Sequence, residues 1–232
     1  MSNAAARDKL LRHGWLSMMP AEFSAALLDI CVWKVIAANA PLYVAGDPPG
    51  GIFGIAEGTI SYTVALGRSD SPPAHFGKAV VWTGLGPLLS GQPRRATIMA
   101  VEPVVAAYVP LAPLRAMMTA KPDWWMHIAQ ELLIEFDVAS TMANDLLIRS
   151  ARRRCAAMLL RIADCRFAPP PVSTIPEAQI TQEALAEMCN LSRSSISPII
   201  KAMVDDGQVI ASYRAIRLLD YAALRLIADS DW

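Results

Sequence analysis

A run of polar side chains between Ser192 and Lys201 has the residue types and spacing needed to contact nucleic acid. In a helix, where successive residues are rotated by about 100°, Ser194, Ser197 and Lys201 share the face opposite an apolar stripe, with Arg193 at its flank. Arginine can donate two parallel hydrogen bonds to guanine, and serine hydroxyls can bond phosphate oxygens. These residues therefore predict a helix that reads a groove of double-stranded DNA.

Two short helices joined by a tight turn are expected to position this face. Thr181 is placed to cap the first helix, and Asn190, which tolerates positive φ, falls in the turn over residues 189–191. Ser192 caps the second helix, whose apolar positions recur at i, i+3, i+4 and i+7. This stripe consists of Ile196, Ile199, Ile200 and Met203. Its burial against the first helix would leave the polar face outside.

Two short strands are predicted after Gly207, over residues 208–213 and 214–219, with Arg214 at the tip of the turn. Asp220 then caps a final amphipathic helix. Residues 180–220 thus have the pattern of a winged helix-turn-helix. The expected DNA-contacting residues are Thr181, Gln182, Ser192, Arg193, Ser194, Ser195, Ser197, Lys201 and Arg214. Among them Arg193 would read bases, and Ser192, Ser195, Lys201 and Arg214 would position the backbone.

Pro198 is unusual inside this second helix, because proline removes a backbone hydrogen bond and clashes with the preceding turn, at a cost of about 3 kcal/mol. The helix is expected to kink there or to begin later. Since the face carries many short side chains, we expect few direct base contacts and a DNA site read partly through water or DNA shape.

The N-terminal half predicts a different architecture. Over residues 41–109, short apolar segments split by glycine and proline favour strands of a small barrel or roll, among them 52–55 and 60–64. Pro122 suits the first turn of a long helix. The apolar stripe of this helix consists of Ile128, Leu132, Phe136, Ala139, Ala143 and Leu146. The stripe predicts either a seam with a second copy, giving a symmetric dimer, or packing against the chain's own roll.

The whole chain is thus predicted to be α+β, with an N-terminal jelly-roll-like β-roll and flanking helices, a long dimerisation helix and a C-terminal winged helix-turn-helix. The expected domains are an effector-sensing domain over 1–120, the dimerisation helix over 121–150 and the DNA-binding domain over 151–232. The hinge is placed between Ser150 and Arg152, and the proline-rich segment 168–176 is expected to be irregular.

Composition restricts the function classes. The 232 residues are 54% hydrophobic and 18% charged, which favours two globular parts over a disordered tail or a coiled rod. Neither a membrane-spanning run nor a secretory signal is expected, so a cytoplasmic location is predicted. The net charge is zero, so a DNA-binding protein must concentrate its positive charge locally. The residues available are Arg149, Arg152, Arg153, Arg154, Arg193, Lys201, Arg214 and Arg217, although a solvated helix surface would explain at least half of them.

The sequence indicates neither a metal site nor a catalytic set. Cysteines at 31, 155, 165 and 189 show no C-x-x-C spacing, and histidines at 13, 75 and 127 are scattered. No nucleophile with a base or paired carboxylates emerges, so the protein is not expected to be an enzyme. Most cysteines are expected to be buried. A thiol sensor at Cys155, beside an arginine run that could lower its pKa, remains an alternative.

Several motifs recur together in one known family. They are Leu42-Tyr43-Val44-Ala45-Gly46-Asp47-Pro48 with Gly58, then Gly91-Gln92-Pro93-Arg94-Arg95-Ala96-Thr97, Arg154-x-Ala156-x-x-Leu159-Leu160, and Thr181-Gln182-Glu183-x-Leu185-Ala186 with Leu191-Ser192-Arg193. In this combination the chain resembles the CRP/FNR superfamily of bacterial transcription regulators over residues 10–228. The resemblance implies a homodimer that binds two-fold symmetric DNA and works with RNA polymerase. An effector held by the roll would reposition the long helices.

Site residues implied by the resemblance lie in the roll and on the long helix. Arg94 matches the family's phosphate-binding arginine, but Gly84 stands where cyclic-AMP-responsive members have a ribose-binding glutamate, and Arg95 where they have a small hydroxyl residue. Cyclic AMP in its usual mode is therefore not expected. The predicted effector contacts are Gly84, Leu85, Gly86, Arg94, Arg95, Ala96 and Ser140. They would bind a cyclic nucleotide or another small anionic effector.

Two of these assignments leave alternatives open. Ser140 matches a residue that contacts the base, yet its hydroxyl and that of Thr141 could bond back to their own helix. Arg94 and Arg95 could select an anion or form a solvated pair. A lone N-terminal Cys31 disfavours an iron–sulfur cluster, and Trp82-Thr83, where haem-binding members have a histidine, disfavours haem.

On the DNA side, Arg193 matches the family's guanine reader. Ser194 replaces a frequent acidic reader and Pro198 a frequent basic residue. The leading hypothesis is a homodimeric, effector-responsive transcription regulator. The alternative is a ligand-binding or thiol-sensing module that has lost specific DNA recognition and acts through protein partners.

Overall fold

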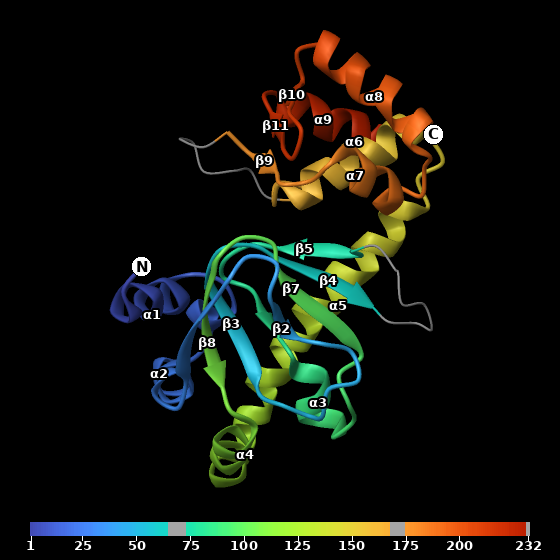
Figure 1. The fold of residues 1–232 in the computed structure, drawn as a ribbon. Coiled ribbons are helices and arrows are strands. Elements are labelled where there is room, and N and C mark those ends of the chain that lie inside the picture. The colour runs from blue at the N-terminus through green and yellow to red at the C-terminus, as the bar shows by residue number, and fades with distance from the viewer. Residues whose placement is uncertain (65–72, 168–174, 231–232) are drawn as a thin grey trace. The chain divides into compact units, whose positions relative to one another are not determined.

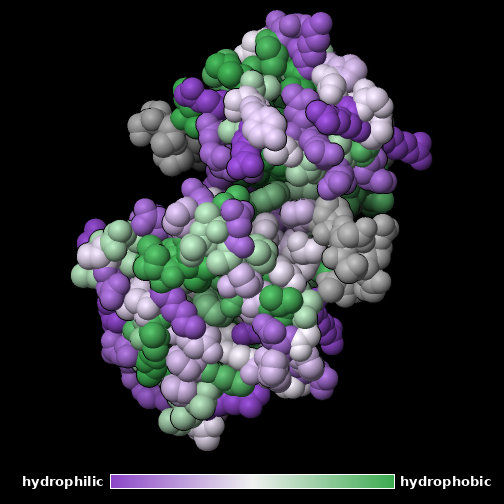
Figure 2. Space-filling view, viewed as in Figure 1, coloured by the Kyte–Doolittle hydropathy of each residue, from purple (hydrophilic) through white to green (hydrophobic). Residues whose placement is uncertain are grey.

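The computed structural model describes residues 1–64, 73–167 and 175–230, which form two compact units, Met1–Asp137 and Val138–Trp232 (Figure 1). The mixed α+β class predicted from the sequence is confirmed. The finer division with boundaries at 120 and 150 stays a prediction. Hydrophobic and hydrophilic residues are interspersed on the viewed face of each unit (Figure 2).

The first unit is built around a roll of two four-stranded antiparallel sheets, in the orders β1-β8-β3-β6 and β2-β7-β4-β5. The strands are β1 (Val32–Ile36), β2 (Pro41–Tyr43), β3 (Ile52–Glu57), β4 (Ile60–Val64), β5 (His75–Gly77), β6 (Trp82–Thr83), β7 (Ala96–Ala100) and β8 (Val104–Val109). The predicted strands at 52–55 and 60–64 are confirmed as β3 and β4. Between them Gly58 has φ +92°, and an added Cβ would meet the Pro103 carbonyl at 2.6 Å, so glycine is required at this turn.

Helices pack against strands β3, β6 and β8 and form a second hydrophobic core with them, separate from the core inside the roll. They are α1 (Asn3–Arg12), α2 (Ala21–Asp29), α3 (Leu85–Ser90), α4 (Leu111–Ala120) and α5 (Trp125–Leu146), with 3₁₀ turns at Trp15–Met18 and Pro122–Trp124. Trp15 contacts Phe23 and Trp82 edge-to-face, with ring centroids 5.6 and 5.3 Å away. This aromatic packing anchors α2 and β6 to one core. Pro122 opens the turn that leads into α5, as predicted.

The second unit consists of helices around a small sheet with the order β10-β11-β9. Its elements are α6 (Ala151–Ile162), β9 (Glu177–Ala178), α7 (Gln182–Met188), α8 (Arg193–Asp205), β10 (Val209–Ala211), β11 (Ile216–Leu218) and α9 (Tyr221–Asp229). Ser150 caps α6 by accepting a hydrogen bond from the Arg153 N–H. Sequence reasoning missed β9, a pair of residues too short to show alternation. Residues 168–174 of the predicted irregular segment lie outside the described residues.

A buried ion-pair network stabilises the second unit where α5 ends. Asp145 is fully buried, and its carboxylate pairs with Arg161 and, at 3.4 Å, with Arg166. Arg166 also pairs with Asp229 of α9 at 2.7 Å. The end of α5 is thereby tied to α6 and α9 within this unit.

Candidate functional site

The turn between α7 and α8 forms as its residues predict. Thr181 accepts a hydrogen bond from the Ala184 N–H at 3.1 Å and so caps α7. Asn190 has φ +51°, and the Leu191 N–H bonds the Ala186 carbonyl at 2.8 Å, which closes the turn. Ser192 accepts from the Ser195 N–H at 3.2 Å and caps α8. The predicted caps and the predicted left-handed asparagine are confirmed.

Helix α8 buries one side and exposes the other. Ile196, Ile200 and Met203 are buried, and Ile199 is half-buried. The opposite face is exposed along its length and carries Arg193, Ser194, Ser195, Ser197, Pro198 and Lys201. Within the part of the chain that the structure describes, the Arg193 guanidinium makes neither an ion pair nor a hydrogen bond. It is therefore available to an external acceptor.

The serines of this face bond to one another and to the backbone. The Ser192 hydroxyl lies 2.9 Å from that of Ser194 and 2.8 Å from that of Ser195. Ser197 donates to the Arg193 carbonyl at 3.1 Å, and its contact with Gln182 of α7 is longer, at 3.4 Å. Hydroxyls can rotate to accept or donate elsewhere, so this cluster remains usable by a phosphate or by water.

Pro198 does not delay the start of α8. The helix runs unbroken from Arg193 to Asp205 with Pro198 inside it, so the expected alternative of a later start is wrong. Pro198 lies one turn and a half into the helix, where it leaves the Ser194 carbonyl without its helical donor. Because this side is exposed, water can bond that carbonyl, which lowers the cost.

The wing also forms, with Arg214 exposed at its tip between β10 and β11. The Ser212 N–H bonds the Ala215 carbonyl at 2.8 Å and closes the turn. Sequence reasoning missed Tyr213, which is 84% exposed and whose ring lies 5.7 Å from the Arg214 guanidinium carbon. The sequence signal for this residue was an aromatic side chain next to an arginine at a predicted turn.

The arginines of α6 serve the fold more than a DNA surface. Arg152 pairs with Asp206 at 2.6 Å, and Arg154 donates through Nε to the Cys189 carbonyl at 2.7 Å, next to the α7–α8 turn. Arg217 lies 3.9 Å from Glu177. Of the predicted positive cluster, Arg193 and Lys201 are exposed on α8, and Arg214 and Arg217 are exposed on the wing.

In the roll, Arg94 is buried and already bonded. Its side chain donates to the Gly84 carbonyl at 3.0 Å and to the Gly51 carbonyl at 2.5 Å, and its guanidinium carbon lies 4.1 Å from the centre of the Tyr43 ring. Burial lowers the pKa of Arg94. Arg95 is exposed instead, so the two arginines do not form a solvated surface pair, and their selection of an anion stays a prediction.

Gly84 has no room for the glutamate of the cyclic-AMP-responsive members. It caps α3 with φ +98°, and an added Cβ would lie 2.7 Å from Arg94 Nη1 and 3.1 Å from the Gly51 carbonyl oxygen. The other predicted contacts are dispersed. Leu85 belongs to the core, Gly86 is exposed and Ala96 is half-buried at the start of β7. Ser140 is exposed on α5.

Sequence reasoning missed two carboxylates of α5 that face the roll. Glu131 is 4% exposed and accepts a hydrogen bond from the Trp82 backbone N–H. Burial, with the nearby Glu135, raises the pKa of Glu131 to about 8, and burial raises that of Glu135 to about 7. Two acids four residues apart beside Ile128 and Leu132, on the apolar stripe, were the available signal.

The stripe of α5 is used in two ways. Ile128 is fully buried in the core of the first unit, and Leu132 packs against that core. Phe136 is 66% and Leu146 46% exposed, and Ala139 and Ala143 are exposed as well. The N-terminal part therefore packs on the chain's own roll, whereas the rest has no cover within the described residues.

Most of the cysteines are buried. Cys155, Cys165 and Cys189 are buried, as expected for most of them. Contact with the Cys189 thiol and burial raise the pKa of Cys155, so the suggested lowering by the arginine run is wrong. Among the described residues, clusters of His, Cys, Asp and Glu able to hold a metal are absent. None of the described helices is long and apolar enough to cross a membrane.

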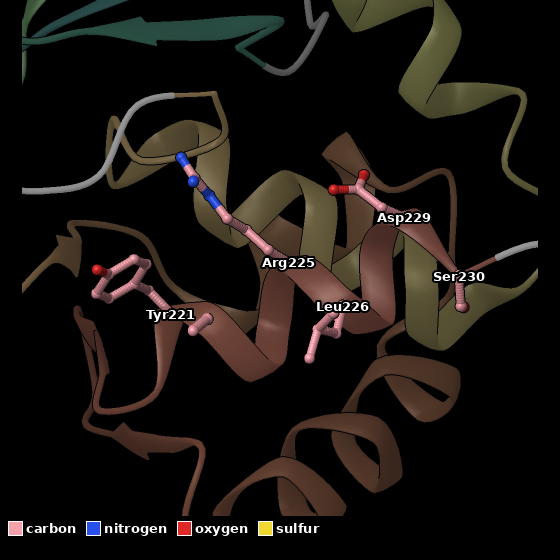
Figure 3. A pocket seen from close by; sticks show the side chains of 6 residues that line it. Tyr221, Arg225, Leu226, Asp229 and Ser230 are labelled. Atoms are coloured by element: carbon pink, nitrogen blue, oxygen red, sulfur yellow. The ribbon is translucent and has the colours of Figure 1, made fainter.

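An open hollow lies beside α9 and is lined by Tyr221, Ala222, Arg225, Leu226, Asp229 and Ser230 (Figure 3). Its charged side chains already have partners, although Arg225 Nη2 is buried without one. Arg225 donates to the Cys165 carbonyl at 2.9 Å, and Asp229 pairs with Arg166. The hollow therefore offers little specific chemistry to a ligand.

Comparison with known proteins agrees with both units. Residues 33–121 match the model of the cyclic nucleotide-binding domain, and residues 153–227 match that of the Crp-like helix-turn-helix domain. The chain is 27% identical over 126 residues to the cAMP-activated global transcriptional regulator CRP of Pasteurella multocida. That alignment spans 53% of this chain and 58% of the relative.

Solved structures share the fold at low sequence identity. A CRP-family transcriptional regulator from Thermus thermophilus has a TM-score of 0.67 at 22% identity, covering 85% of this chain and 97% of its own. The c-di-GMP responsive global regulator CLP of Xanthomonas campestris also has a TM-score of 0.67, at 15% identity, covering 86% and 99%.

Proposed function

We propose, from the premise that this chain belongs to the CRP/FNR superfamily of DNA-binding transcription regulators, that it acts as a homodimer whose paired α8 helices read a two-fold symmetric site. The exposed Arg193, which has no partner among the described residues, is the observation that carries this proposal. A bidentate arginine–guanine contact discriminates against other bases by about 1 to 3 kcal/mol. Lys201, Arg214 and the serines at 192 and 195 would hold the phosphate backbone.

The test is selection of a preferred duplex from random sequence by the full chain. The expected product is an inverted repeat with half-sites about one helical turn apart, because a symmetric dimer places two recognition helices that far apart. Selection should fail with Arg193→Ala and succeed with Arg115→Ala, a matched loss of one exposed arginine in the first unit. An unselective wild type would contradict the proposal. It would favour the alternative of a ligand-binding module that acts through protein partners.

Dimerisation is proposed to use the uncovered part of α5. Phe136 and Leu133 of this helix, and Leu147 just after it, are each more than 60% exposed, and exposed apolar side chains gathered in one place mark an interaction surface. Phe136→Glu is expected to shift the protein to monomers in sedimentation experiments and to weaken DNA binding. As in the family, the dimer would act on RNA polymerase at promoters.

The roll is proposed to bind a small effector other than cyclic AMP in its usual mode. One relative is named as cAMP-activated and another as c-di-GMP responsive, so this fold serves different effectors. In this chain Gly84 offers no carboxylate to a ribose, and Arg94 already donates to two backbone carbonyls. Losing one charge-assisted hydrogen bond weakens binding at least about tenfold. Cyclic AMP is therefore expected to leave the melting temperature unchanged.

A further inference from the structure

Two acidic side chains of α5 lie buried against the roll, inside the first unit. One oxygen of Glu131 is satisfied by the Trp82 N–H, but its Oε2 is buried and has no hydrogen-bond partner. Glu135, one helical turn further on, is half-buried and lies close enough to act on Glu131 electrostatically. A buried oxygen without a donor costs about 1 to 3 kcal/mol, more when it is charged.

Hydroxyl groups of three strands face these acids. The Tyr43 hydroxyl of β2 lies 2.7 Å from the Thr83 hydroxyl of β6. Tyr62 of β4 lies close enough to this group for its pKa to be affected by Thr83, Tyr43, Glu135 and Glu131. Burial is the largest cause and raises the pKa of Tyr62. Burial likewise raises the pKa of Tyr43 to about 12. We call Tyr43, Tyr62, Thr83, Glu131 and Glu135 the α5–roll acidic cluster.

The cluster contains no cation of its own. Over the described ranges, neither Glu131 nor Glu135 forms an ion pair with a lysine, arginine or histidine. Arg94, which stacks on Tyr43, donates to the carbonyls of Gly51 and Gly84 rather than to a carboxylate. The His75 ring lies 5.6 Å from that of Tyr62. Among the residues that the structure places, the cluster thus gathers acceptors, with one buried oxygen unpaired, and has no positive partner.

We propose that the α5–roll acidic cluster binds a small organic cation, an ammonium or guanidinium group of the effector. This inference rests on the proposed role of the roll as the effector domain and names the chemistry of that effector. An ammonium or guanidinium group supplies several donors, of which one can satisfy Glu131 Oε2 while another reaches Glu135. The aromatic rings of the cluster favour a cation over an anion. A phosphate placed here would instead face two carboxylates, so the anionic effector predicted from the sequence does not suit this part of the site.

Binding should be linked to proton release. With pKa values raised to about 8 and about 7, both carboxyl groups are largely protonated at pH 6 and largely ionised at pH 8.5. Tyr43 and Tyr62 stay neutral over this range, because burial raises their pKa values further. A cation binds the ionised form, so affinity should be about tenfold or more higher at pH 8.5 than at pH 6.

The experiment is calorimetric titration of the full chain with agmatine, which carries one guanidinium and one ammonium group, at pH 8.5 and pH 6. The uncharged diol 1,4-butanediol is the comparison ligand. Saturable agmatine binding is expected at pH 8.5, about tenfold or more weaker at pH 6, and absent with the diol. Glu131→Gln and Glu135→Gln should each weaken it about tenfold or more. Glu57→Gln, an exposed carboxylate at the end of β3, is the matched control and should bind as the wild type does.

Three outcomes would overturn the inference. They are no binding of agmatine at either pH, equal binding by Glu131→Gln, and a stability that follows pH identically with and without agmatine. The third outcome would indicate that the cluster responds to protons and does not bind the cation. Duplex selection by the same samples keeps the two proposals separate. Intact DNA selectivity with no cation binding contradicts only this inference, whereas lost selectivity contradicts the proposed function.

Discussion

Helices α8 and α5 carry polar side chains in opposite circumstances. On α8 the polar residues are exposed, and Arg193 has no intramolecular partner among the described residues. On α5 Glu131 and Asp145 are buried, and only Asp145 is paired with arginines. Exposed groups cost the fold little and are free for a partner, whereas buried groups affect stability and pKa. Substitution of the exposed polar groups of α8 should therefore change DNA binding with little effect on stability, whereas substitution of Glu131 or Asp145 on α5 should change stability.

The largest expected effect is at Asp145. Asp145→Ala leaves the buried Arg161 without its carboxylate and removes one of the two carboxylates of Arg166, which should lower the free energy of unfolding of the second unit by about 3 to 5 kcal/mol. Urea unfolding followed by circular dichroism measures it.

The matched control is Asp206→Ala, which breaks the exposed Arg152–Asp206 pair and should cost about 0 to 1 kcal/mol. Equal losses at the two positions would contradict the contrast between buried and exposed charge.

The second effect concerns pH. The pKa of Glu131 is about 8 in the folded chain, against 4.5 for the ordinary group. The folded state therefore holds a proton that the unfolded state releases, so this stabilisation is complete below about pH 4.5 and is lost as the pH rises through 8. The loss across this window is on the order of 3 kcal/mol, after a discount for water reaching the site.

Glu131→Gln keeps the shape of the neutral acid and should remove most of this slope. Thermal melts between pH 5 and 9 would show the variant melting above the wild type at pH 9 and close to it at pH 5. Parallel curves for the two proteins would show that Glu131 is not the titrating group.

A smaller effect is expected at Gly84. Gly84→Ala forces a Cβ to within 2.7 Å of Arg94 at φ +98°, which should lower the free energy of unfolding by about 1 to 3 kcal/mol. Gly86→Ala is the control, since an added Cβ there meets nothing within 4 Å. Differential scanning calorimetry compares the two. A wild-type melting temperature for Gly84→Ala would mean that Arg94 is not held as described.

Much of α8 could be predicted from the sequence because its signals are local. Caps at Thr181 and Ser192, the positive φ of Asn190 and the apolar stripe each depend on residues within one or two turns. Exposure of Arg193 follows from the same periodicity. Its role in DNA reading is still a prediction.

The roll site could not be predicted in the same way, because its contacts join distant segments. Arg94 donates to the carbonyl of Gly51, 43 residues away in sequence. The local sequence does not show that Arg94 would be buried while the adjacent Arg95 is exposed. Glu131 lies on an apolar stripe, where its burial against Trp82 depends on how α5 packs on the roll. Long-range packing decides pKa values, so the acidic cluster emerged only with the fold.

The most direct measurement is the coupling between Arg193 and one guanine of the selected duplex. Affinities would be measured for the wild type and for Arg193→Ala, each with two duplexes. One duplex is the selected site, and in the other that guanine pair is exchanged symmetrically in both half-sites. If Arg193 reads the guanine, the two changes together should cost less than their sum, by about 1 to 3 kcal/mol per half-site, with unchanged protein stability. Strictly additive losses at every guanine of the site would contradict it.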